Sequence, residues 1–102
     1  MAFNGKEGTY IGLDNGGDLT SKWRTGGNGP IKGYFYGKEK LQHLLDQEGS
    51  EGIRIYFGEE VTGEKTLVLV AADARENDII SAPGAQILDK GIVCPPTCGG
   101  VN

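Results

Sequence analysis

Apolar residues in the middle of the chain recur at the spacing of a helix. Between residues 38 and 48, Leu41, Leu44 and Leu45 stand at positions i, i+3 and i+4 among charged and polar residues. This spacing places the three leucines on one side of an amphipathic helix. Gly49 follows where a helix C-cap favours the positive φ of glycine. The sequence therefore predicts a helix over residues 38–48.

Three other segments show the patterns of strands. Apolar and polar residues alternate over residues 31–36 and 51–58, and apolar residues run together over 66–72. The run over 66–72 predicts a middle strand that is covered on both faces. Gly63 suits the bulged turn of a hairpin between this strand and 51–58. We expect strand 31–36 to join this antiparallel hairpin, and residues 87–88 to form a last short strand or a helical turn.

A weaker helix is expected near the N-terminus. Asp14 can cap a helix that places Leu19 and Trp23 four residues apart on one face. Gly16 and Gly17 each weaken this helix by about 1 kcal/mol relative to Ala. The helix therefore depends on packing against other parts of the protein.

The elements together predict an α+β fold, in which a small three- to four-stranded, mainly antiparallel sheet is covered by one or two helices. A chain of 102 residues fits one domain, and no repeat or long linker divides it. We expect a single domain over residues 1–102, with an extended segment at 1–13 and a cysteine-containing tail at 91–102. The residues expected to form its core are Phe35, Leu41, Leu45, Ile53, Ile55, Phe57, Leu67 and Leu69.

Composition excludes several classes of protein. Ten Lys and Arg against fourteen Asp and Glu give a net charge of −4, which argues against a general nucleic-acid or anionic-membrane binder. The longest apolar run, Leu67 to Ala72, is far shorter than the ~20 residues that span a bilayer. The N-terminus lacks an apolar segment after a basic start, so we expect no secretory signal and a cytoplasmic location by default.

The charge is unevenly distributed along the chain. Residues 1–43 carry six basic and four acidic residues, whereas residues 44–102 carry four basic and ten acidic residues. A mildly basic half and an acidic half can attract copies of the same chain head to tail. Solvated faces of different composition would give the same distribution.

Aromatic residues are the candidates for an interaction surface. Trp23, Tyr34, Tyr36 and Tyr56 either share a face that a partner binds or pack beneath the helices. No catalytic residue is predicted, because His43 is the single histidine and no Ser-His-Asp or Cys-His arrangement can be built around it. No cofactor and no metal site within one chain are expected.

The two cysteines form the most distinctive chemical pattern, Cys94-Pro-Pro-Thr-Cys98. A turn brings such α-carbons within the ~4.4–6.8 Å that a disulfide requires. Two free thiols, half of a zinc site that lacks two ligands, and a redox-active pair are the alternatives. A disulfide would indicate an oxidising setting, and therefore an extracellular location reached without a secretory signal.

Much of the chain is similar to a known group of proteins. The segments that carry the similarity are IKGYFYGKE (31–39), GIRIY (52–56), TLVLV (66–70) and CPPTC (94–98). With them the chain resembles a group of short uncharacterised bacterial proteins over roughly residues 19–98. The resemblance implies a shared fold and a recurrent C-terminal cysteine pair, and it supplies no catalytic residues.

Three classes of function are compatible with these observations. A non-enzymatic structural or interaction protein that assembles with copies of itself, into an oligomer or a filament, is favoured by the charge distribution, the 18 glycines and the strand edges that a small sheet exposes. The alternative is a small accessory protein that binds a metal or ligand through Cys94 and Cys98. An enzyme is the third class.

Overall fold

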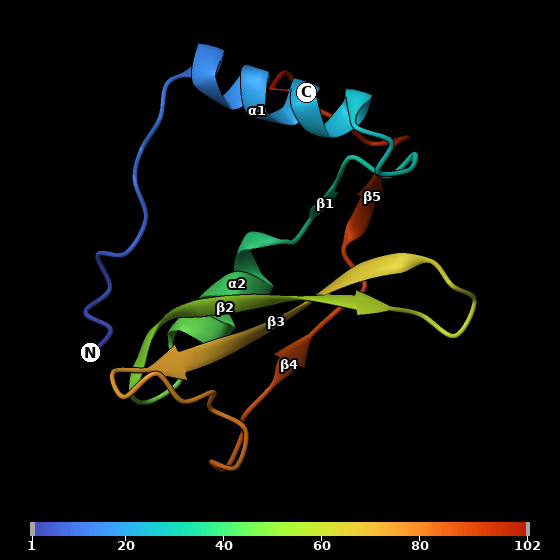
Figure 1. The fold of residues 1–102 in the computed structure, drawn as a ribbon. Coiled ribbons are helices and arrows are strands. Elements are labelled where there is room, and N and C mark those ends of the chain that lie inside the picture. The colour runs from blue at the N-terminus through green and yellow to red at the C-terminus, as the bar shows by residue number, and fades with distance from the viewer. Residues whose placement is uncertain (1, 102) are drawn as a thin grey trace. The chain divides into compact units, whose positions relative to one another are not determined.

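The computed structural model describes residues 2–101 and contains helices and strands in two groups. The strands form two antiparallel sheets, a three-stranded sheet with the order β2-β3-β4 and a two-stranded sheet of β1 and β5 (Figure 1). This confirms the predicted α+β class. The elements in chain order are α1 (Leu13–Thr25), β1 (Gly33–Phe35), α2 (Lys38–Leu45), β2 (Ser50–Glu59), β3 (Lys65–Asp73), β4 (Ile87–Leu88) and β5 (Ile92–Cys94).

The chain divides into two compact units. The three-stranded unit comprises Met1–Glu7 and Tyr36–Gly91, and the two-stranded unit comprises Gly8–Phe35 and Ile92–Asn102. The first contains α2 with β2, β3 and β4, and the second contains α1 with β1 and β5. Within residues 2–101, neither helix is long and apolar enough to cross a membrane.

The three-stranded unit is built on the predicted hairpin. β2 and β3 pair from Ser50 opposite Asp73 to Glu59 opposite Lys65, and Gly63 in the connecting loop has φ +88°. β4 pairs with the other side of β3, so residues 87–88 form a strand. β3 is therefore the middle strand, and its successive residues Leu69, Val70, Ala71 and Ala72 are all buried, as the apolar run predicts.

The core lies between α2 and one face of this sheet. Leu44 of α2 is 2% exposed and packs with Leu69 and Ala71 of β3. Because side chains alternate along a strand, Leu67, Leu69 and Ala71 share this face, and the ladder places Ile53 of β2 opposite Ala71. The core cluster also includes Ile79 and the partly buried Tyr36, Leu41, Ile53, Leu67, Ala85 and Leu88.

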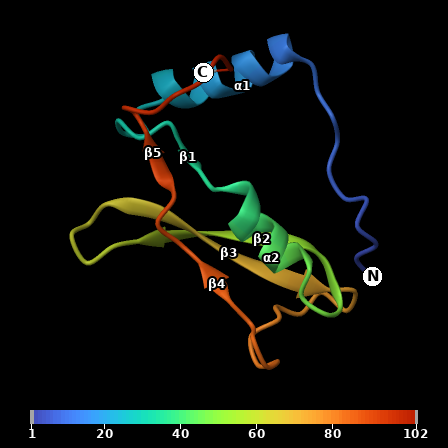
Figure 2. The ribbon, with the colours of Figure 1, turned by 180° about the vertical axis from the view of Figure 1, so that it is seen from behind.

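Four residues predicted to lie in the core are exposed instead, so this part of the prediction is wrong. Ile55 and Phe57 are 57% and 93% exposed, although they share the face of Ile53. The eight residues of α2 extend about 12 Å, whereas the ten residues of β2 extend about 33 Å. The helix therefore covers only the end of the hairpin away from its loop (Figures 1 and 2). The other two are Leu45 and Phe35, at 43% and 61% exposed.

The second helix also ends earlier than predicted. It stops at Leu45, and the N–H of Asp46 donates to the carbonyl of Gln42 at 2.8 Å. Gly49 has φ +84° but lies in the turn that leads into β2 rather than at the helix end. Leu44 faces the sheet, and Leu45 is turned about 100° away from it at the final residue of the helix.

In the two-stranded unit, strand 31–36 does not join the hairpin, which corrects the prediction. β1 pairs with β5 of the tail, with Gly33 opposite Cys94 and Phe35 opposite Ile92. The expected N-terminal helix is present as α1, with Gly12 rather than Asp14 at its N-cap. No residue of α1 is buried.

Candidate functional site

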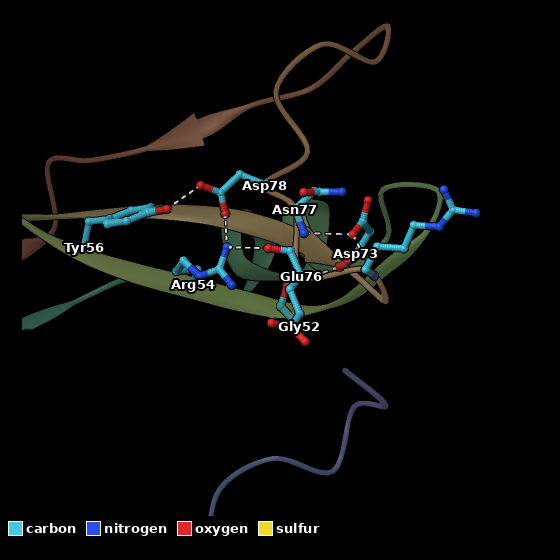
Figure 3. A network of polar contacts seen from close by, with 9 residues as sticks. Gly52, Arg54, Tyr56, Asp73, Glu76, Asn77 and Asp78 are labelled. Atoms are coloured by element: carbon cyan, nitrogen blue, oxygen red, sulfur yellow. Dashed lines mark hydrogen bonds and ion pairs between the residues drawn. The ribbon is translucent and has the colours of Figure 1, made fainter. Parts of the chain in front are cut away.

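A polar network lies on the face of the three-stranded sheet opposite α2 (Figure 3). Arg54 and Tyr56 alternate with Ile53 along β2, so their side chains project from that face. The Arg54 guanidinium donates from Nη1 to Oδ1 of Asp78 at 2.5 Å, and the Tyr56 hydroxyl donates to Oδ2 of the same carboxylate at 2.5 Å. Arg54 also donates to the carbonyl of Glu76 at 3.2 Å. One carboxylate thus joins two side chains of β2.

The turn after β3 positions this carboxylate. The Asp73 carboxylate accepts the N–H groups of Arg75 and Asn77 at 2.9 and 3.0 Å, which is the local bonding that makes Asp frequent in turns. The turn ends with Asp78 bridged to Ala72 beside β3. Because Arg54 comes from the strand on the other side of β3, the ion pair crosses that strand.

The network also involves the N-terminal segment. The ring centroid of Phe3 lies 5.3 Å from the Arg54 guanidinium, a cation–π contact, and the Phe3 N–H donates to the carbonyl of Ala74 at 3.0 Å. A surface depression of about 370 Å³ lies beside them, with Glu7 and Glu51 among its lining residues.

The electrostatics of the network favour a fixed ion pair. The hydrogen bond from Tyr56, together with Arg54, lowers the pKa of Asp78 against the effect of burial. The hydrogen bond to Asp78 raises the pKa of Tyr56 and also that of Arg54. All three pKa values move away from neutrality, so none of these groups is tuned to exchange a proton near pH 7. The arrangement suits holding the turn across the sheet rather than acid–base chemistry.

The sequence reasoning missed Arg54 and Asp78. The two residues are 24 positions apart, and no periodic pattern relates them. The available signal was a charged residue between Ile53 and Ile55 in an otherwise apolar stretch of strand. A charged side chain at such a position requires an opposite charge or a hydrogen-bond partner when other parts of the chain shield that face of the strand from water.

The four aromatic candidates do not share one face. Tyr36 packs on the core cluster and donates its hydroxyl to the carbonyl of Leu67 at 3.1 Å. Tyr56 stands opposite Val68, on the other face of the sheet. Trp23 and Tyr34 belong to the two-stranded unit, where the Trp23 indole N–H donates to the carbonyl of Ile31 at 3.2 Å. Trp23 is 47% exposed.

The cysteine tail forms the predicted small ring. Cys94 and Cys98 are joined by a disulfide, with their α-carbons 4.9 Å apart. Beyond the ring, the tail reaches α1, where the Thr20 hydroxyl donates to the carbonyl of Val101 at 3.4 Å. Cysteines in a disulfide have no thiolate to offer a metal. Among residues 2–101, no three His, Cys, Asp or Glu side chains cluster as a metal site.

Replacing Cys94 and Cys98 together by Ser is expected to loosen the tail, with a bounded loss of stability. The ring closes so few residues that the chain-entropy estimate of its effect is at most about 2 kcal/mol. Hydrogen exchange at Thr97 should accelerate, since its N–H lies in the ring and donates to the carbonyl of Val93 at 3.3 Å. Intact mass of the native chain tests the premise, because the disulfide makes it about 2 Da lighter than the reduced chain. An unchanged mass after reduction would contradict it.

Comparisons of this chain with protein-family models, with curated proteins and with solved structures found no match.

Proposed function

We propose that this chain is a non-enzymatic interaction protein that assembles with copies of itself. The observation that carries the proposal is the exposure of the two-stranded unit. α1 has no buried residue, and Leu13, Leu19 and Trp23 are 68%, 59% and 47% exposed. An isolated helix of this length is marginal in water, and a sheet of two strands is marginal as well. Both elements therefore need further apolar contact, which a partner can supply.

Charge supports a second copy as that partner. The two-stranded unit carries three basic residues and two acidic residues. The three-stranded unit carries seven basic and twelve acidic residues. Units of opposite net charge favour a head-to-tail contact, and a head-to-tail contact that does not close extends into a filament.

Light scattering on the size-separated protein tests this proposal. Wild-type protein is expected to have a mass above the 10.8 kDa of one chain, and Leu13→Gln with Leu19→Gln should reduce it. Thr25→Gln is the matched control, because Thr25 is exposed and lies about 120° around α1 from each of the two leucines. Raising the salt from ~50 to ~500 mM should also weaken the assembly by screening the opposite charges. A wild-type monomer at micromolar concentration, or a double variant with the wild-type mass, would contradict the proposal.

A further inference from the structure

The outer edge of β2 has no partner strand among residues 2–101. β2 has ten residues and pairs only with β3, since the sheet order is β2-β3-β4. Such an edge presents backbone N–H and C=O groups that can pair with another strand, and proteins usually protect it with charges, Pro or bulges. Between Ile53 and Gly58 this edge has one charged residue, Arg54, and no Pro. The irregularity of the ladder lies at its start, between Ser50 and Gly52.

Three consecutive residues of this edge, Ile55, Tyr56 and Phe57, expose large apolar or aromatic side chains. Phe57 is 93% exposed and Ile55 is 57% exposed, and both lie on the same face of β2. Two neighbouring apolar side chains on a free strand edge supply both of the interactions that strand addition uses, backbone hydrogen bonds and apolar side-chain contact. The pattern therefore fits a partner that is itself a strand with exposed apolar residues.

We propose that this edge pairs antiparallel with the same edge of a second copy, so that two three-stranded sheets become one six-stranded sheet. A two-fold contact of this kind is self-complementary only in particular registers. Centring the two-fold on Tyr56 places Ile55 of each copy opposite Phe57 of the other. Tyr56 then stands opposite itself, and Arg54 stands opposite Gly58, which has no side chain to obstruct it.

Two registers centred nearer the start of β2 are less favourable. Centring on Ile55 places Glu51 opposite Glu59, and it also uses the end of β2 that the N-terminal segment approaches. Centring on Arg54 opposes two arginines. Like charges directly opposite one another destabilise a strand pair. The register centred on Tyr56 avoids both of these pairs and covers the two most exposed apolar side chains of β2.

This inference rests on the proposed function in taking a second copy as the partner, but it uses a different surface. The head-to-tail contact involves the two-stranded unit, whereas the β2 contact involves the three-stranded unit alone. A two-fold contact closes on itself and gives a dimer. Both contacts together link dimers into longer assemblies.

Cysteine cross-linking tests the register. In a Tyr56→Cys variant the two added thiols stand directly opposite each other, at α-carbon separations of ~4.5–5.5 Å that permit a disulfide. The native cysteines are already paired with each other, so the added thiol reports on this position. Val61→Cys is the control, since Val61 is 105% exposed in the hairpin loop. Under mild oxidation, Tyr56→Cys is expected to form covalent dimers at least about tenfold faster. Equal rates would overturn the register.

A side-chain variant tests the interface without an added thiol. Phe57→Gln is expected to weaken dimerisation at least about tenfold, because each dimer loses two Ile–Phe pairs. Val61→Gln removes an equally exposed side chain outside the interface and should leave dimerisation unchanged. Sedimentation equilibrium measures the dimerisation of both variants. Each is made in the Leu13→Gln and Leu19→Gln background, which lacks the head-to-tail contact and in which a dimer should persist. If the Leu13→Gln and Leu19→Gln double variant is a monomer, the β2 interface alone is overturned. If the double variant has the same assembly mass as the wild-type protein, the head-to-tail contact alone is overturned.

Discussion

Replacing Leu44 by Ala is expected to lower the free energy of unfolding by roughly 2–5 kcal/mol, the range for truncating a buried leucine. Leu44 is 2% exposed, and it is the α2 side chain at the centre of the core cluster, packed with Leu69, Ala71 and Ile79. The truncation leaves a cavity between helix and sheet that a core this small has few side chains to fill. A chain of this size has a total stability of roughly 5–15 kcal/mol. Urea denaturation followed by circular dichroism measures the loss.

Leu45→Ala is the matched control, because it makes the same chemical change one residue away. Leu45 is 43% exposed at the last position of α2, so its truncation should cost less than about 1 kcal/mol. The ratio of the two losses reports which side of the helix faces the sheet. Equal losses, or a larger loss at Leu45, would contradict the helix orientation described here.

The sequence was sufficient to predict the elements whose contacts are local. The hairpin of β2 and β3 joins neighbouring segments through a short loop, and Gly63 marks its turn. α2 was recognised from the spacing of its leucines. The partner of β1 could not be predicted in the same way, because β5 lies about sixty residues further along and neither strand exceeds three residues. Segments this short carry too few residues for a periodic pattern.

Burial was harder to predict than strand position, for a physical reason. Alternation indicates which residues of β2 share a face, and it places Ile53, Ile55 and Phe57 together correctly. It carries no information on how far the covering helix extends, and α2 is too short to reach Phe57. In the proposed dimer, Ile55 and Phe57 cover one another across the two-fold. The alternation would then reflect burial in the assembly rather than in the single chain.

Asp78→Asn is expected to lower the free energy of unfolding by roughly 1–3 kcal/mol, since it leaves a charged partner without its counter-ion. The Arg54 and Asp78 side chains are 28% and 20% exposed, which sets them apart from the surface pair of Lys65 and Glu59 at 70% and 56%. Glu59→Gln is therefore the matched control, with a smaller expected effect because solvent screens this exposed pair. Combining Asp78→Asn with Arg54→Met completes a double-mutant cycle, and the coupling energy isolates the interaction between the two residues.

The pH dependence of this effect follows from the lowered pKa of Asp78 in the folded protein. A carboxyl whose pKa is lower when folded contributes its full stabilisation above its unfolded pKa of ~3.9, and loses it as the pH falls through the folded pKa. The stability difference between wild type and Asp78→Asn should thus stay constant from about pH 5 to 8 and shrink below about pH 4. Denaturation at several pH values checks this, because a protonated Asp78 resembles the Asn that replaces it. A difference that grows as the pH falls, or that is absent at pH 7, would contradict the ion pair across β3.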